Sequence, residues 1–263
     1  MIIVKIGGGS SLNLSGIIED LSGIQDRFII IHGANALRDE LAEALGQPKQ
    51  VLTSVKGYDS VYSDEKLIDV MMMAYSGLRN KRIVEMCQQH GINAVGLSGI
   101  DGKVIRGKRN SGIRVIQDGK KKIIRDFSGK PEKVNTSFLR LLLDNGYTPV
   151  LTVPIIDENN IAINTENDDV VRVLQDSIQA DTVISLIEAS GFLLDKDDES
   201  SLIKKISPLE LEEREQQVDG RMKRKMLSFV KLFEHGATKV IISDGRTEHP
   251  VIDALAGKGT VIS

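Results

Sequence analysis

The chain has 263 residues, 41% of them hydrophobic, which is enough to bury one large core or two lobes that share a sheet. Its 34 basic and 37 acidic residues leave a formal net charge of only −3, which excludes recognition of nucleic acid or a membrane surface through overall charge. The single cysteine, Cys87, excludes an internal disulfide and a cysteine metal cluster, and it fits a reducing cytoplasm.

The first residues form a short apolar run broken by glycines, without the basic start and longer apolar core of a signal peptide. No other run approaches the length of a membrane span. We therefore expect a soluble, cytoplasmic protein.

Short apolar runs of strand length recur along the chain. We expect them to be buried strands at 2–6, 28–31, 94–97, 149–153, 182–186 and 239–242. Stretches with helical spacing lie between most of them, at 36–45, 64–90, 136–145, 169–179 and 222–235. This alternation predicts an α/β fold with a mostly parallel sheet that is covered on both faces.

Two regions interrupt the alternation. Residues 103–135 contain the turn signals 109–112, 118–119 and 128–129 between short β-branched runs, so we expect a β-hairpin insertion that projects from the sheet. Residues 195–218 are rich in charge and contain Ser207-Pro208. We expect them to form a surface flap and a short helix ahead of the helix that begins near Gly220.

A glycine-rich turn, residues 5–11, follows the first strand and precedes a helix around 16–21. Glycines let the backbone approach phosphate oxygens, and the start of a helix adds oriented N–H groups, so we expect an anion site here. The sequence is neither a Walker A loop nor a G-x-G-x-x-G turn. The lysine of this turn, Lys5, lies within an apolar strand, where its desolvation requires an anion unless the side chain reaches solvent at the strand end. A second glycine turn, His32-Gly33-Ala34-Asn35, follows the next strand.

The motifs VKIGGG, IHGAN, NAVGLSGIDG, AINTEND and GRMKRK, in this order and spacing, resemble the amino acid kinase family over essentially the whole chain. Within it, the sequence is similar to the acetylglutamate kinase branch and to kinases that act on aminoadipate or glutamate linked to the carrier protein LysW. The resemblance implies a carbamate kinase-like, three-layer αβα sandwich as a single domain, 1–263. Residues 1–175 would form the substrate-side lobe and 176–263 the nucleotide-side lobe.

The resemblance implies transfer of the γ-phosphoryl group of ATP to a carboxylate, a reaction that depends on positioning and charge neutralisation. Lys5 and Lys225 would contact the transferring group from its two sides. Asp168 would orient both lysines rather than act as a base, because an ionised carboxylate has no proton to remove. Gly7, Gly8 and Gly9 would line the phosphate path, and Mg²⁺ would arrive with ATP rather than in a dedicated protein site.

On the substrate side, the resemblance implies that the backbone N–H groups of Gly33 and Ala34 hold the substrate carboxyl and that the Asn164 side chain binds its amide. An alternative interpretation makes Asn164 a turn residue and Asp168 an ordinary acid of a first helical turn.

On the nucleotide side, residues 186–193 would bind adenosine, with Glu188 where an aspartate is usual and Gly191 at the turn. Met222 and Lys223 would contact ATP from the next helix. An equally ordinary interpretation makes Met222 a core residue and Lys223 a surface residue.

Three positions depart from the pattern of the branch. Ala34 replaces a second glycine, residues 165–168 read Thr-Glu-Asn-Asp, and Val61 stands where an arginine is expected to pair with a substrate carboxylate. Loss of that arginine implies a different substrate, a replacement cation such as Lys56, or lowered activity. Because Lys5, Asp168 and Lys225 remain, we favour altered substrate recognition over an inactive enzyme.

The insertion is strongly basic. Residues 103–133 hold eleven basic residues and three acids, a local net charge of +8. Such a patch predicts docking of something acidic, and the near absence of aromatic residues argues against single-stranded nucleic acid. The kinases that the chain resembles present a basic surface to a small acidic carrier protein, whereas the alternative is a solvated hairpin without a partner.

These observations lead to three functional hypotheses. The first is a kinase of carrier-linked 2-aminoadipate or glutamate in lysine or arginine biosynthesis, and the second is an N-acetylglutamate kinase. The third is a nucleotide-binding regulator or carrier-binding protein with weakened catalysis, while a dinucleotide-binding fold is disfavoured by the missing G-x-G-x-x-G. The family also implies a homodimer, with the apolar stretch 71–75 as a candidate contact, although a helix buried within one subunit has the same pattern.

Overall fold

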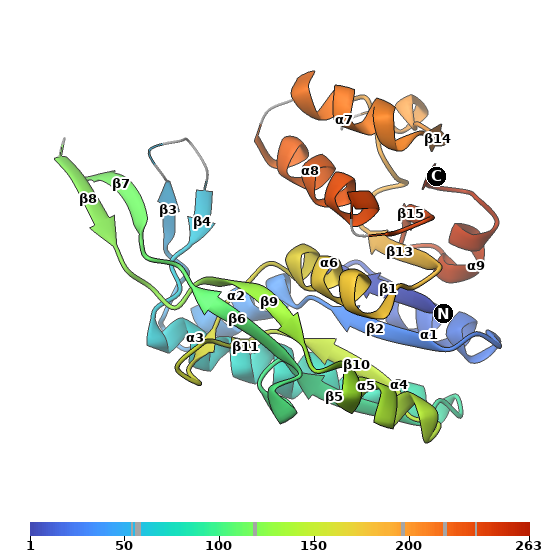
Figure 1. Ribbon diagram of the computed structural model, residues 1–263, viewed down its shortest axis with the longest axis horizontal. Coiled ribbons are helices and arrows are strands. Elements are labelled where there is room, and N and C mark those ends of the chain that lie inside the picture. The colour runs from blue at the N-terminus through green and yellow to red at the C-terminus, as the bar shows by residue number, and fades with distance from the viewer. Residues whose placement is uncertain (54, 56–58, 118–119, 196–197, 218–219, 235) are drawn as a thin grey trace.

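A single eight-stranded sheet runs through the molecule in the computed structural model (Figure 1), which describes residues 1–263 except 54, 56–58, 118–119, 196–197, 218–219 and 235. The strand order is β14-β16-β15-β13-β1-β2-β10-β5, and the strands from β15 to β5 run parallel. Only β16 and its neighbour β14 are reversed within this sheet. The strands are β1 (Ile2–Ile6), β2 (Phe28–His32), β5 (Ala94–Ser98), β10 (Thr148–Thr152), β13 (Thr182–Ile187), β14 (Lys205–Ile206), β15 (Val240–Asp244) and β16 (Thr260–Ile262).

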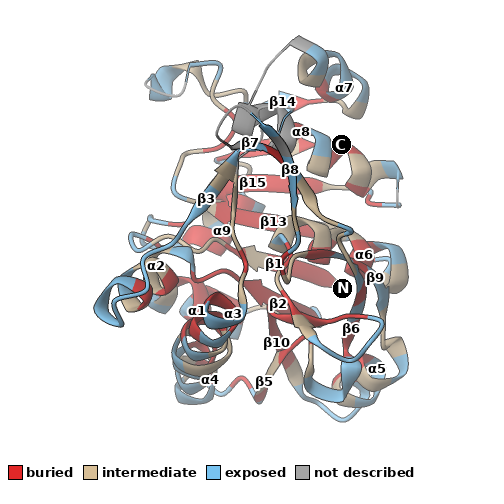
Figure 2. Cartoon of the chain, turned by 90° about the vertical axis from the view of Figure 1, so that its left-hand side faces the viewer, coloured by how far each residue is buried: buried red, intermediate tan, exposed pale blue. Residues whose placement is uncertain are grey.

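Helices cover both faces of this sheet, because successive side chains of each strand point to opposite sides. Along β1, Ile2, Val4 and Ile6 pack into one core cluster, which includes residues of α1 (Leu14–Ser22), α4 (Asn80–Gln89) and α9 (Pro250–Leu255). Ile3 belongs to the cluster on the other face, formed with α5 (Thr136–Asp144), α6 (Asn167–Ile178) and α8 (Gly220–Glu234). Figure 2 shows the buried strands between these helical layers. The predicted three-layer αβα sandwich with a mostly parallel sheet is confirmed.

The remaining helices lie at the edges of the two layers. They are α2 (Asn35–Ala44), α3 (Glu65–Met71) and α7 (Pro208–Gln217), with the short 3₁₀ turns η2 (Asp101–Lys103) and η3 (Glu199–Ser201). Between α3 and α4 the chain forms a π-helix, η1 (Met72–Arg79), where the spacing of residues 64–90 predicts an ordinary helical stretch. π-Helical segments are rare and occur mostly at functional sites.

A smaller sheet and two hairpins project from the main sheet. The smaller sheet has the order β12-β11-β6-β9, formed by β6 (Ile105–Arg109), β9 (Gly129–Val134), β11 (Ile155–Ile156) and β12 (Ala162–Ile163). The predicted insertion is confirmed, since β6 and β9 enclose the hairpin of β7 (Ile113–Gln117) and β8 (Lys120–Ile124).

A second hairpin, β3 (Val51–Thr53) with β4 (Asp59–Val61), was not expected from the sequence. It lies beside β7–β8 (Figure 1), and the backbone N–H of Val55 donates to the carbonyl of Arg114 at 2.8 Å.

The charged region 195–218 contains η3, β14 and α7 within its described part, followed by α8 from Gly220 as expected. One sheet continues from β1 and β2 directly into β13, so the division into lobes 1–175 and 176–263 stays a prediction. Among the described residues, no helix is both long enough and apolar enough to cross a membrane.

The stretch 71–75 is largely internal to the subunit. Met71, Ala74 and Tyr75 are at most 2% exposed, and Met73 alone of these five is strongly exposed, at 45%. The intrasubunit core therefore accounts for most of its apolar character, and the homodimer stays a prediction.

Candidate active site

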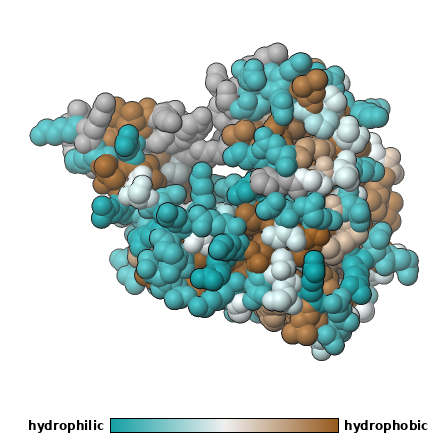
Figure 3. All heavy atoms as spheres, viewed as in Figure 1, coloured by the Kyte–Doolittle hydropathy of each residue, from teal (hydrophilic) through white to brown (hydrophobic). Residues whose placement is uncertain are grey.

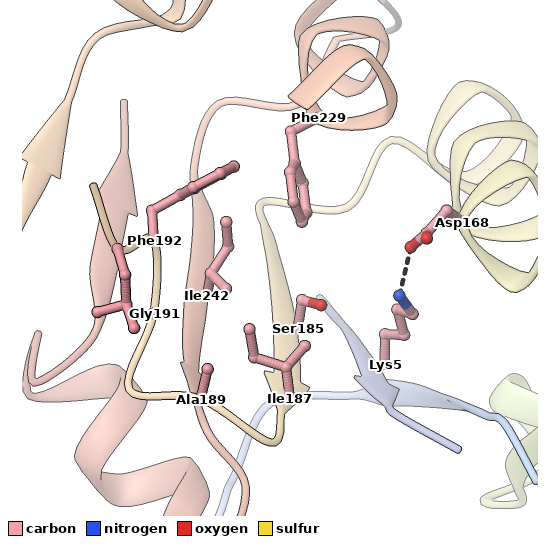
Figure 4. Close-up of a pocket in the computed structure, with 10 residues that line it drawn as sticks. Lys5, Asp168, Ser185, Ile187, Ala189, Gly191, Phe192, Phe229 and Ile242 are labelled. Atoms are coloured by element: carbon pink, nitrogen blue, oxygen red, sulfur yellow. Dashed lines mark hydrogen bonds and ion pairs between the residues drawn. The ribbon is translucent and has the colours of Figure 1, made fainter. Parts of the chain in front are cut away.

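The side chain of Lys5 forms an ion pair with Asp168 across the layer between the sheet and α6. Lys5 lies near the carboxyl end of β1 and points to the α6 face, and Asp168 lies in the first turn of α6 (Figure 4). The two side chains are only 14% and 32% exposed. Burial of a lysine in a central strand is costly without an opposite charge, and Asp168 supplies that charge. The sequence-based expectation that Asp168 orients Lys5 therefore fits this geometry.

The two glycine turns lie in direct contact beside this pair. A Cβ atom at Gly8 would be 2.6 Å from the backbone nitrogen of Asn35, and one at Gly33 would be 2.9 Å from the Cα of Gly8. The carbonyl of Gly8 also accepts from the N–H of Ala36 at 3.0 Å. Glycine is therefore required at both positions by close backbone approach, and the turn 7–9 meets the N-terminus of α2.

Gly9 is covered by two charged side chains from distant parts of the chain. Arg79 donates from Nη2 to the carbonyl of Gly9 at 2.9 Å, and the Glu188 carboxylate lies where a Gly9 Cβ would be. The N–H and hydroxyl of Ser11 donate to Glu188 at 2.9 and 2.5 Å, and these bonds hold the pKa of Glu188 below its ordinary value. Glu188, predicted to bind ATP, is thus an ionised group that fixes the glycine turn.

The Lys5–Asp168 pair also lines a pocket of about 200 Å³. Figure 4 shows Lys5 and Asp168 at one end of the pocket. Gly191 also lines the pocket, and its contact with ATP stays a prediction. The walls of the pocket are mainly apolar, formed by Ile187, Phe192, Leu193, Phe229 and Ile242.

Two further features describe the inside of the pocket. The rings of Phe192 and Phe229 meet edge to face with centroids 6.0 Å apart. The Ser185 hydroxyl, also in the pocket, is buried and has no partner among the described residues. An apolar cavity that ends at a lysine suits a nucleoside base and its phosphates.

The helix α8 carries Phe229 to this pocket and also contains Met222, Lys223 and Lys225. The side chains of residues 220–225 lie outside what the structure describes. The predicted contacts of Met222 and Lys223 with ATP, and of Lys225 with the transferring group, therefore stay predictions.

Asn164, which is predicted to bind the substrate amide, follows β12 and is oriented by Ser63. The Ser63 hydroxyl has one proton, which it donates to the carbonyl of Val61 at 3.2 Å. It must therefore accept from Nδ2 of Asn164, at 3.0 Å, and the Oδ1 of Asn164 is left as an acceptor without a partner in the described part of the chain. A free carbonyl-type oxygen suits an N–H donor, such as the amide of a blocked amino acid.

The second glycine turn offers fewer donors than the sequence suggests. The N–H of Gly33 donates to the carbonyl of Ile6 at 2.9 Å, and the buried N–H of Ala34 interacts with the hydroxyl oxygen of Tyr75. A carboxylate bound here as predicted would compete with both interactions. The N–H of Asn35 has no partner among the described residues.

Val61 is half-buried and packs against the apolar cluster on the α6 face, so it supplies no charge to a substrate. Lys56, the predicted replacement cation, lies outside the described residues. Arg109 is another candidate for the replacement cation. Its guanidinium lies 4.0 Å over the Phe127 ring, and its Nε donates to the carbonyl of Asp126 at 2.7 Å.

The backbone of Phe127 links this arginine to Ser63 and Asn164. Its N–H donates to the carbonyl of Ser63 and its carbonyl accepts from the N–H of Asn164, both at 2.7 Å. The buried Asp126 carboxylate accepts from the N–H of Ser63 at 3.1 Å and from the Ser128 hydroxyl at 2.6 Å. Sequence reasoning missed Arg79, Tyr75, Ser63, Asp126 and Arg109 as site residues, because each reaches the site through a contact distant in sequence.

An apolar pocket ending at a lysine–aspartate pair beside two interlocked glycine turns defines a nucleotide-dependent phosphotransferase site. The model of the amino acid kinase family matches residues 1–244, and the chain belongs to this family. The predicted phosphotransferase acting on a carboxyl group is confirmed at this level, and the family implies use of ATP.

Two relatives that match this chain over its whole length are kinases. A [LysW]-aminoadipate kinase of Thermus thermophilus is 38% identical over 100% of both chains, and one of Deinococcus radiodurans is 38% identical over 100% of this chain and 91% of its own.

Solved structures share the fold. An N-acetylglutamate synthase of Neisseria gonorrhoeae superposes with a TM-score of 0.79 at 21% identity; the match covers 100% of this chain and 59% of the synthase. A carbamate kinase of Giardia has a TM-score of 0.68 at 14% identity over 99% of this chain and 97% of its own. The predicted carbamate kinase-like fold is therefore confirmed.

Proposed function

We propose that the protein is an ATP-dependent kinase of an amino-blocked 2-aminoadipate or glutamate, attached to an acidic amino-group carrier protein, in lysine or arginine biosynthesis. The observation that carries the proposal is the Lys5–Asp168 pair, which lies between an apolar pocket and two glycine turns. The names of the relatives from Thermus and Deinococcus support the substrate class. A homodimer and a cytoplasmic location, both implied by the family resemblance, belong to the same proposal.

ATP fits the pocket through its chemistry. The adenosine would lie against Ile187, Phe192 and Phe229, and the phosphates would extend toward Lys5 and the turn 7–9. In the described part of the chain, no group of three or more His, Cys, Asp or Glu side chains could hold a metal ion. Mg²⁺, which the family resemblance implies, would accompany ATP and neutralise phosphate charge.

The acceptor carboxylate would attack while ionised, so no catalytic base is required. Lys5 would neutralise charge on the transferring group, and Asp168 would hold the lysine in place without leaving the pair. The acceptor would lie on the Asn164 side, where Oδ1 of Asn164 can accept from the blocked amino N–H. Arg109 would bind a carboxylate of the acceptor in place of the arginine that Val61 replaces.

The carrier would dock on the outer face of the β7–β8 hairpin. Cross-strand register pairs Arg114 with Ile123, and Ile116, two residues from Arg114 along β7, shares its face. All three are exposed, with Ile116 at 61% and Ile123 at 64%. Figure 3 shows hydrophobic side chains among hydrophilic ones on this projecting part. Aliphatic contacts framed by basic residues suit a small acidic protein.

Reversing two exposed charges of this hairpin, Arg114→Glu in β7 with Arg125→Glu directly after β8, is expected to lower kcat/KM for the carrier-linked substrate about tenfold at low salt, because electrostatic steering is lost. The difference should narrow at high salt, where charges are screened. Lys204→Glu with Lys205→Glu is the matched control, because both lysines are exposed and lie at β14, away from the hairpin (Figure 1). Unchanged carrier kinetics in the hairpin variant would refute the docking surface and leave the reaction proposal intact.

The decisive experiment measures ATP-dependent acyl phosphate, trapped as hydroxamate, with carrier-linked aminoadipate, carrier-linked glutamate and N-acetylglutamate in parallel. We expect turnover on a carrier-linked substrate. Turnover on N-acetylglutamate alone would make the protein an acetylglutamate kinase. ATP binding without turnover on any acceptor would overturn the proposal in favour of a regulatory protein.

A further inference from the structure

Asn35, the first residue of α2, lies directly over the phosphate-binding turn. Its side-chain Cγ would be 3.0 Å from a Cβ at Gly8, and its backbone nitrogen would be 2.6 Å from the same point. The N-cap of α2, Ala34, has no side-chain oxygen to satisfy the first N–H groups of the helix. The positive end of α2 and the Asn35 amide therefore both face the turn along which phosphates would pass.

The hydroxyl of Tyr75 fixes the orientation of this amide. Tyr75 is 2% exposed, extends from the π-helix η1, and donates its proton to Oδ1 of Asn35. Burial raises the pKa of Tyr75 to about 12, so the hydroxyl keeps this proton at neutral pH. The same oxygen interacts with the N–H of Ala34, which leaves the Tyr75 proton for Asn35.

With Oδ1 occupied, Nδ2 of Asn35 carries two donor hydrogens that have no partner among the described residues. Asn35 is solvent-exposed overall, so an incoming ligand can reach it. Lys5 supplies charge from β1, whereas Asn35 supplies neutral, directional donors from the start of α2, next to Gly8. Preorganised donors of this kind stabilise charge that develops during group transfer.

We infer that Asn35 is a further catalytic residue, which donates from Nδ2 to the transferring phosphoryl group, and that Tyr75 is its positioning residue. The inference rests on the proposed kinase reaction. In that step an acceptor carboxylate oxygen bonds to the γ-phosphorus while the bond from this phosphorus to the β–γ bridging oxygen breaks. The electron pair of the broken bond leaves with ADP, and no proton moves. The equatorial oxygens of the phosphoryl group carry the charge that Asn35 would contact.

Asn35→Ala is expected to lower kcat about 10- to 100-fold, the effect of losing one hydrogen bond to a charged group, with little change in the KM for ATP. Asn35→Asp should lose more activity, because it puts a negative charge at the phosphate path. Yet an acid in the first turn of α2 should maintain or raise the melting temperature, since it favours the helix dipole. Glu40→Ala, exposed on the same helix, is the control and should keep wild-type kinetics.

Tyr75→Phe tests the positioning role in a double-mutant cycle. Alone, it should lower kcat about tenfold, because the Asn35 amide can then rotate; in an Asn35→Ala background it should have little further effect on kcat. Additive losses would overturn the role of Tyr75, and wild-type kcat in a folded Asn35→Ala variant would overturn the inference. Absence of turnover in the wild type would instead refute the proposed reaction, so the two failures are distinguishable.

Discussion

Lys5→Met is expected to lower kcat about 1,000-fold or more, because it removes the cation that lies between the apolar pocket, where we propose that ATP binds, and the glycine turns. The methionine fills a similar volume in β1, so the fold should persist. The measurement is hydroxamate formation at saturating ATP and acceptor, together with the melting temperature. A folded Lys5→Met variant with wild-type turnover would contradict the assignment of Lys5 as a catalytic residue.

Asp168→Asn tests the partner of this lysine. Lys5 is only 14% exposed, so loss of the aspartate leaves a largely buried ammonium group without a counter-charge. We expect both kcat and the melting temperature to fall. Asp169→Asn is a matched control in the same helical turn, since Asp169 faces Arg172 at 3.9 Å rather than Lys5. Equal effects of the two substitutions would indicate that Asp168 acts only through its favourable interaction with the α6 dipole.

The main sheet could be predicted because its strands are continuous apolar runs. Parallel strands buried on both faces need apolar residues at every position, and the predicted run 2–6 matches β1 at both ends. The same reasoning marked Lys5 as a charge that requires a partner. It did not identify that partner, because Asp168 lies 163 residues away and only the family resemblance pointed to it.

The hairpin β3–β4 could not be predicted in the same way. Each of its strands has three residues, too few for alternation to be distinguished from chance. Its position depends on tertiary contacts, such as the bond from Val55 to the β7 backbone. The longer insertion 103–135 was recognisable because glycine-containing turns separate its β-branched runs.

The π-helix accounts for two of the missed residues, Tyr75 and Arg79. A regular helical pattern assigns Tyr75 and Arg79 to one face, but it contains no indication that the turn widens between them. In the structure both reach the glycine turns, Tyr75 through Asn35 and Arg79 through the carbonyl of Gly9. Asn35 lies within the motif IHGAN, yet its role depends on a hydroxyl 40 residues away. Contacts of this kind are set by packing rather than by local sequence.

Gly8→Ala should lower kcat about 100-fold, because misplacement of reacting groups by about 1 Å has an effect of this size. The added methyl carbon would be 2.6 Å from the backbone nitrogen of Asn35 and 2.9 Å from that of Ala34. Backbone atoms cannot move aside as a flexible side chain can, so the turn and the start of α2 must separate. Steady-state kinetics and the melting temperature measure the effect, and both should fall.

Two other glycines supply the controls for this steric argument. At Gly9 the three atoms nearest to the added carbon belong to the Glu188 carboxyl group. This side-chain end can rotate away at the expense of its bonds to Ser11, so Gly9→Ala should be milder than Gly8→Ala. At Gly23 the backbone φ is −86° and the nearest atom is 3.5 Å away, so alanine there should leave kcat unchanged. If Gly8→Ala behaved like Gly23→Ala, the two glycine turns would not need to touch for catalysis, and the preorganisation of Asn35 over Gly8 would lose its physical basis.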